Sequence, residues 1–134
     1  MLKLLLDTHV FLWAFLEKGK LSQKVIDELL ENTEVEKYLS AASSWEISIK
    51  HAKGRLFLPE PPKVFVPTRM IEAGINPLAV SHRDTLNVGD LPDVHKDPFD
   101  RLIITQARLN DLTILSDDEL FEDYDVQLIR ADKF

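Results

Sequence analysis

The stretch LKLLLDTHVFLWAFL, residues 2–16, decides the fold of this chain. Its first part, residues 2–6, is a short apolar run and predicts a buried strand. Asp7 ends this run, and the apolar residues 10–16 that follow predict a helix. A buried strand that leads directly into a helix is typical of proteins in which helices cover a parallel sheet.

The rest of the chain continues this alternation. Further strands are predicted at 35–39, 75–80, 113–115 and 126–129, helices at 22–31, 43–53, 62–73, 81–88 and 98–110, and a single turn at 118–121. Ser22, Ser81 and Asp97 are expected N-caps. Pro67 should bend or interrupt its helix, and Gly54 and Gly74 mark helix ends. The pattern predicts one three-layer α/β domain over residues 1–134, with a mostly parallel sheet flanked by helices.

Composition narrows the class of protein. The chain has 134 residues, a formal charge of -7 and no cysteine, which excludes disulfides, thiolate zinc sites and cysteine nucleophiles. The acidic balance argues against broad electrostatic binding of nucleic acid, but it leaves room for a metal-assisted nuclease. The apolar N-terminal stretch is too short to span a membrane, and no small-residue cleavage site follows it. We therefore expect a cytoplasmic protein that keeps its N-terminus and has no membrane partner.

Acidic residues that could form a functional site occur in four segments of the chain, each at or near an end of a predicted strand or helix. Asp7 ends the first strand, where a helix cap is the alternative role. Glu46 lies in SSWEISIK, where Ser43-x-x-Glu46 is also a capping box. In HKDPFDR, Asp97 suits the N-cap and Asp100 is the better ligand. In ILSDDELF, two aspartates follow Ser116, and Asp118 is preferred over Asp117.

These acids meet at one sheet edge if the first and fourth strands are neighbours. Packed carboxylates repel one another and have raised pKa values unless cations neutralise them. An oxygen-only ligand set favours Mg²⁺ or Mn²⁺, and such a site suits phosphodiester hydrolysis. The sequence does not decide between one and two metal ions.

Taken together, LLLDTHVFLW at 4–13, SSWEISIK at 43–50, HKDPFDRLIITQA at 95–107 and TILSDDELF at 113–121 resemble a PIN domain. The resemblance is closer to the toxin subunit of VapBC-type toxin–antitoxin pairs. It implies a Mg²⁺-dependent endoribonuclease, an RNA substrate, a homodimer and an antitoxin that blocks the active site. By matching position, it implies the metal-binding and catalytic residues Asp7, Glu46, Asp100 and Asp118, with support from the hydroxyls of Thr8 and Ser116.

Other features leave alternatives open. Arg101 is a candidate phosphate contact or an ion-pair partner. The four histidines show no metal-ligand spacing, so surface or capping roles are expected for His9, His51, His82 and His95.

The helix at 10–16 is apolar all round, so either the monomer buries Phe11, Trp13 and Phe15 or a partner such as the antitoxin covers them. A receiver-type signalling module and a non-catalytic binding protein are the alternative functions.

Overall fold

The computed structural model describes all 134 residues, which build one five-stranded sheet. The strands are β1 (Lys3–Leu6), β2 (Glu36–Ser40), β3 (Ile75–Leu78), β4 (Thr113–Ser116) and β5 (Leu128–Arg130). They lie in the order β3-β2-β1-β4-β5, and every pair of neighbours is parallel. The predicted parallel α/β sheet is confirmed.

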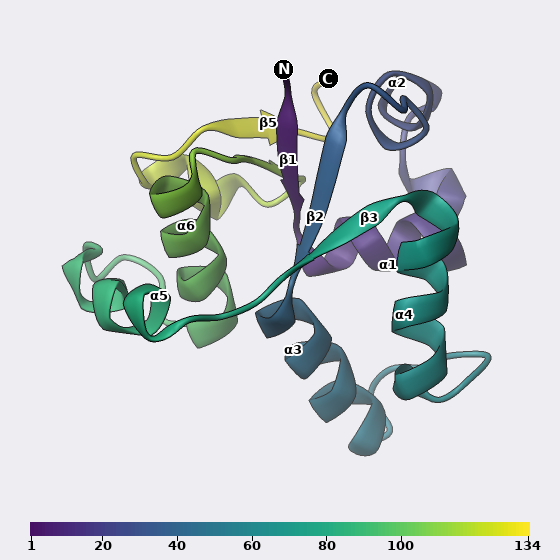
Figure 1. Cartoon of the computed structure of the whole chain (residues 1–134), viewed down its shortest axis with the longest axis horizontal. Helices are drawn as coiled ribbons and strands as arrows, with labels where there is room; N and C mark the ends of the chain where they lie inside the picture. The colour runs from purple at the N-terminus through teal and green to yellow at the C-terminus, as the bar shows by residue number, and fades with distance from the viewer.

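Helices cover both faces of the sheet (Figure 1). They are α1 (Thr8–Leu16), α2 (Gln23–Val25) with its π-helical continuation η2 (Ile26–Leu30), α3 (Ala41–Ala52), α4 (Pro62–Ala73), α5 (His82–Asn87) and α6 (Pro98–Asn110). Single 3₁₀ turns are η1 (Lys18–Lys20), η3 (Val88–Asp90) and η4 (Glu119–Asp123). None of the helices has the length and apolar content needed to span a lipid bilayer.

Strand β1 divides the core in two because its side chains alternate between the faces of the sheet. Leu4 and Leu6 pack with residues of α1, α2, η2, α3 and α4. Leu5 packs on the other face with Ile103 and Ile104 of α6. The three predicted layers are therefore present, with α1, α2 and α4 on one side of the sheet and α5 and α6 on the other (Figure 1).

Some predicted details are wrong. Helix α4 runs through Pro67, so the predicted interruption is wrong, and the burial of Phe65 and Val66 in the core supports the helix across the missing hydrogen bond. Helix α3 begins at Ala41, two residues before the predicted start at Ser43. Phe11 is wholly buried, so it offers no surface to a partner, whereas Trp13 and Phe15 are only half-buried.

The strand order reverses at β1, with β2 and β3 on one side of it and β4 and β5 on the other. Ligands of open α/β sheets bind beyond the carboxyl ends of the strands at such a reversal, which here lies beyond β1 and β4. Receiver-type modules have the order 2-1-3-4-5 instead. The topology therefore argues against the receiver alternative.

Candidate active site

Asp7 stands at the carboxyl end of β1 and is bound to the end of β4. Its backbone N–H donates to the carbonyl of Leu115 at 3.0 Å, and the Ser116 hydroxyl donates to Asp7 Oδ2 at 2.7 Å. The side chain makes no cap hydrogen bond with α1 and is buried, which argues against the alternative role as a solvated helix cap. Burial raises the pKa of Asp7, and the Ser116 hydrogen bond only partly opposes this effect.

Glu46 does not belong to a capping box. Ser40 is the N-cap of α3, accepting a hydrogen bond from the Ala42 N–H at 3.0 Å. Glu46 therefore lies in the second turn, is buried, and accepts a hydrogen bond from Lys50 Nζ at 2.8 Å. The capping reading failed because the helix starts earlier than the sequence indicates.

The hydroxyls of Thr8 and Ser43 join the first turns of α1 and α3. Thr8 donates to the Ser43 hydroxyl at 2.9 Å, and both side chains are buried. This contact fixes the position of the helix that carries Glu46 relative to Asp7. Ser43 was expected to cap α3, and it instead links two helices.

Asp97 is the N-cap of α6, as the sequence predicted, and the ligand role of Asp100 stays a prediction. Asp97 caps α6 by accepting from the N–H groups of Phe99 and Asp100 at 2.9 and 3.3 Å. Asp100 has no capping role; it lies in the first turn of α6, and its side chain is only 17% exposed. Burial raises the pKa of Asp100 to about 8, and the charges of Asp97, Asp7, Glu46 and Asp118 add to the effect.

Asp118 follows β4 and faces the same cluster. It caps η4 by accepting from the Leu120 N–H, and its own N–H donates to Ser116. A carboxylate oxygen of Asp118 lies within 4.8 Å of ligand atoms of Asp100 and His95, whereas Asp117 is not part of this group. Ser116 thus contacts both Asp7 and Asp118 and holds them at the edge of the sheet.

His95 is the residue of the cluster that the sequence analysis missed. We expected a surface or capping role, yet its side chain is only 12% exposed and Nε2 lies 3.6 Å from Asp100 Oδ2. Its place in HKDPFDR, five residues before Asp100, was the available signal. Spacing rules did not reveal it because an irregular segment lies between His95 and the start of α6 and brings the two side chains together.

Arg101 neither pairs with an acid nor stands free. Its guanidinium donates to the carbonyls of Val88, Pro92 and His95 at 3.0 to 3.2 Å. The ion-pair interpretation of Arg101 is therefore wrong, and the phosphate contact stays a prediction. The side chain holds the segment that leads into α6.

Gln106 is a second missed residue, and it fixes α6 to the sheet. It is fully buried, accepts from the Ser40 hydroxyl, and donates to the Ala79 carbonyl and to Asp84, each at 3.0 Å. Sequence patterns treat a glutamine inside an amphipathic helix as surface, and so they gave no signal. Through this network the end of β2 determines where α6 places Asp100.

The rim of the cluster carries an exposed aromatic side chain. Trp45 is 58% exposed and contacts Phe99 edge-on, with ring centroids 5.1 Å apart. The two residues directly precede Glu46 and Asp100 in the sequence. The contact between Trp45 and Phe99 therefore joins the two helices that carry Glu46 and Asp100.

The donor set fits a divalent cation. Four carboxylates gather here, and the pKa of Asp100 is raised first by burial and then by repulsion from the neighbouring carboxylates. A cation would neutralise this repulsion, and carboxylate and hydroxyl oxygens suit Mg²⁺ or Mn²⁺. The side chains able to hold it are those of Asp7, Glu46, Asp100 and Asp118.

The family model described as PIN domain matches residues 4–127. The chain belongs to the PIN domain family. The resemblance noted in the sequence is thereby confirmed for the family, and the acidic cluster lies wholly within the matched part of this PIN domain.

Individual relatives of this PIN domain agree with that result. A stretch of 47 residues, 35% of this chain, is 51% identical to Ribonuclease VapC16 of Mycobacterium tuberculosis and spans 33% of that relative. VapBC2 from Rickettsia felis, solved bound to a DNA fragment from their promoter, matches over 96% of this chain and 98% of that chain, with a TM-score of 0.72 and 14% identity. FitAcB from Neisseria gonorrhoeae matches over 98% and 99%, with a TM-score of 0.66 and 21% identity. At these identities the solved structures show the shared fold alone.

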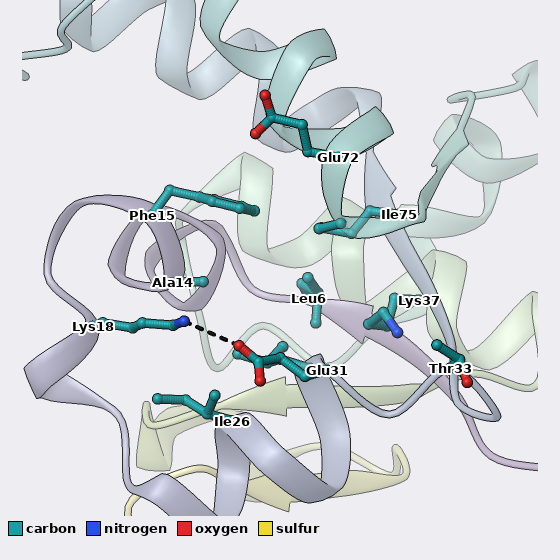
Figure 2. Close-up of a pocket in the computed structure, with 12 residues that line it drawn as sticks. Leu6, Ala14, Phe15, Lys18, Ile26, Glu31, Thr33, Lys37, Glu72 and Ile75 are labelled. Atoms are coloured by element: carbon teal, nitrogen blue, oxygen red, sulfur yellow. Dashed lines mark hydrogen bonds and ion pairs between the residues drawn. The ribbon is translucent and has the colours of Figure 1, made fainter.

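An apolar cavity lies apart from the acidic cluster, between α1, η2, α4 and the sheet. Its volume is about 380 Å³, and its walls include Ala14, Phe15, Ile26 and Leu30. Figure 2 shows Phe15 reaching across the cavity toward Ile75, with the Lys18–Glu31 ion pair at one side.

Proposed function

We propose that the protein is a divalent-metal-dependent endoribonuclease and the toxin of a type II toxin–antitoxin pair. The observation that carries the proposal is that Asp100 is buried beside acids from three other segments of the chain, so that burial first and their charges second raise its pKa to about 8. A structural role does not require four carboxylates in a poorly solvated place, since each costs free energy there. The family membership and the partial similarity to a named ribonuclease support this choice.

Each site residue has a task in phosphodiester hydrolysis. Asp7, Glu46, Asp100 and Asp118 would hold Mg²⁺ or Mn²⁺. Ser116 holds Asp7 and Asp118 in place, and Thr8 joins α1 to the helix of Glu46 through Ser43. The bound cation would supply a water of lowered pKa and neutralise charge on the phosphate. Because this chemistry needs no ribose 2′-hydroxyl as nucleophile, we expect products with a 5′-phosphate and a 3′-hydroxyl.

The rim of the site supports a single-stranded substrate. Proteins bind the unpaired bases of RNA by stacking them on aromatic rings. Trp45 offers an exposed ring beside Glu46, and Phe99 supports that ring from the side. We propose that a base next to the cleaved phosphate stacks on Trp45. We also propose that the protein acts in the cytoplasm, where it would meet its RNA target.

The antitoxin is proposed to place apolar side chains in the cavity beside α1 (Figure 2). Seven of the twelve lining residues are hydrophobic, and helix-in-groove binding uses such cavities for its anchor residues. Trp13 borders a separate polar hollow with Asp117 and Asp118, through which the same partner would reach the active site. The expected homodimer stays a prediction, to be measured as the mass of the purified protein in solution.

The experiment that tests the activity uses purified protein and labelled single-stranded RNA in Mg²⁺ or Mn²⁺. Asp7→Asn and Asp118→Asn should each slow cleavage at least about 100-fold, the scale expected when a group that stabilises charge is lost. Asp111→Asn is the matched control, because Asp111 is exposed at the far end of α6 and its positive φ suits asparagine.

Cleavage in a chelator as fast as in the metal ion would contradict the proposal. So would cleavage by both active-site variants at the rate of the unmodified protein. The RNA ends give a further check, because a 2′,3′-cyclic phosphate product would exclude the proposed water attack.

A further inference from the structure

The Nε2 atom of His95 is a buried polar atom that has no hydrogen-bond partner. Such atoms are rare in proteins, because a buried polar group that is left unpaired lowers stability. The nearest carboxylate oxygen, Asp100 Oδ2, lies 3.6 Å away, which is too far for a hydrogen bond. A simple His95–Asp100 pair therefore does not account for where the ring points.

The ring is held in this position from several sides. The His95 backbone N–H donates to the Tyr124 hydroxyl at 2.7 Å, and its carbonyl accepts from Arg101 at 3.1 Å. The imidazole lies against Phe121, with ring centroids 6.4 Å apart. Three residues from two elements thus fix a histidine whose free nitrogen faces the acids.

The distances suit a shared ion. Nε2 and one oxygen each from Asp100 and Asp118 all lie within 4.8 Å of one another. Donor atoms about 2.1 Å from one ion lie roughly 3.0 to 4.2 Å apart, so side-chain movements of up to about 1 Å would bring all three into contact with it. Asp7 and Glu46 are outside this closest group, although both act on the charge of Asp100.

We propose that His95 is a direct ligand of the metal ion, which it shares with Asp100 and Asp118. This inference rests on the proposed metal-dependent function and extends it to the identity of the metal. A mixed nitrogen and oxygen set binds Mn²⁺ and the later transition metals better than Mg²⁺, which prefers oxygen ligands. The site therefore selects Mn²⁺ over Mg²⁺, which differs from the all-oxygen set expected from the sequence.

The test uses Mn²⁺ as the probe and does not depend on activity. Pulsed electron paramagnetic resonance of the Mn²⁺-loaded full chain should show coupling to a directly bound ¹⁴N nucleus. In protein labelled with ¹⁵N-histidine, the ¹⁴N coupling should disappear and a ¹⁵N coupling should take its place. This measurement is made on the unmodified protein, so it does not depend on the folding of a variant.

Variants then identify the histidine. His95→Gln should remove the nitrogen coupling and weaken Mn²⁺ binding in calorimetry at least about tenfold, while Mg²⁺ binding changes much less. His82→Gln, at an exposed position of α5, should leave both unchanged. Bound Mn²⁺ without nitrogen coupling would overturn the role of His95 and leave the carboxylate site intact. Failure of the unmodified protein to bind Mn²⁺ at all would overturn the proposed metal-dependent function together with this inference.

Discussion

In the metal-free protein, raising the pH from 5 to 7 should destabilise the fold through Asp100. Burial, followed by the charges of the neighbouring carboxylates, raises the pKa of this side chain from 3.8 to about 8. The unfolded chain releases the proton near the lower value, whereas the folded protein keeps it up to the higher value. Between the two pKa values the folded state binds more protons, so its free energy of unfolding falls as the pH rises.

The size of the effect follows from the number of protons. One proton held only by the folded state gives a slope of about 1.4 kcal/mol per pH unit. From pH 5 to pH 7 the contribution of Asp100 therefore falls by about 3 kcal/mol. This is a large part of the 5–15 kcal/mol that is typical of a folded domain.

The assay is urea denaturation in a chelator at pH 5, 6 and 7. Asp100→Asn keeps the side chain neutral at every pH, so this variant should lack the slope that comes from Asp100. The variant should also be more stable than the unmodified protein at pH 7. Asp111→Asn should follow the unmodified protein. Because a metal ion competes with the proton, saturating Mn²⁺ should stabilise the unmodified protein more at pH 7 than at pH 5.

Equal slopes for the unmodified protein and Asp100→Asn would refute the reasoning. That result would mean that Asp100 is ionised in the folded protein at pH 5 and that the other acids do not act on it.

Three further predictions concern the packing, the substrate and the partner. Gln106→Leu should lower the free energy of unfolding by about 2–3 kcal/mol, because it breaks the three hydrogen bonds of this buried side chain. The exposed control Gln23→Leu should change the free energy of unfolding little. Equal urea midpoints for the two variants would contradict this prediction. Trp45→Ala should weaken binding of single-stranded RNA roughly tenfold in a fluorescence titration and leave Mn²⁺ binding unchanged, and unaltered RNA affinity would exclude the stacking role. Ala14→Arg should fill the apolar cavity and prevent co-purification with the product of an abutting upstream reading frame, whereas exposed Ala52→Arg should not; a complex that survives Ala14→Arg would place the partner elsewhere.

The sequence predicted the sheet because its strands carry strong local signals. The run before Asp7 is apolar on both faces, and such a strand has its place at the centre of a covered parallel sheet. Ser22, Ser81, Asp97 and Gly74 act as caps at or beside the predicted positions, because capping depends on nearby residues. The continuity of α4 through Pro67 was not predictable, since it depends on burial of Phe65 and Val66 by distant parts of the chain.

The candidate site was predicted less completely than the fold. The acids at the ends of β1 and β4 were identified because parallel strands end at one edge of the sheet. His95 and Gln106 were missed because their roles depend on contacts with segments far away in the sequence. Glu46 was ambiguous for a different reason, because Ser43 and Glu46 have the spacing of a capping box but lie beyond the true start of the helix.

The most direct test of the central claim is anomalous diffraction from crystals grown with Mn²⁺. The account predicts a strong anomalous peak in contact with Asp100 and Asp118, within reach of Asp7 and Glu46, and lost in Asp100→Asn. The absence of a peak at this position in Mn²⁺-saturated crystals, with ions bound elsewhere on the surface, would contradict it.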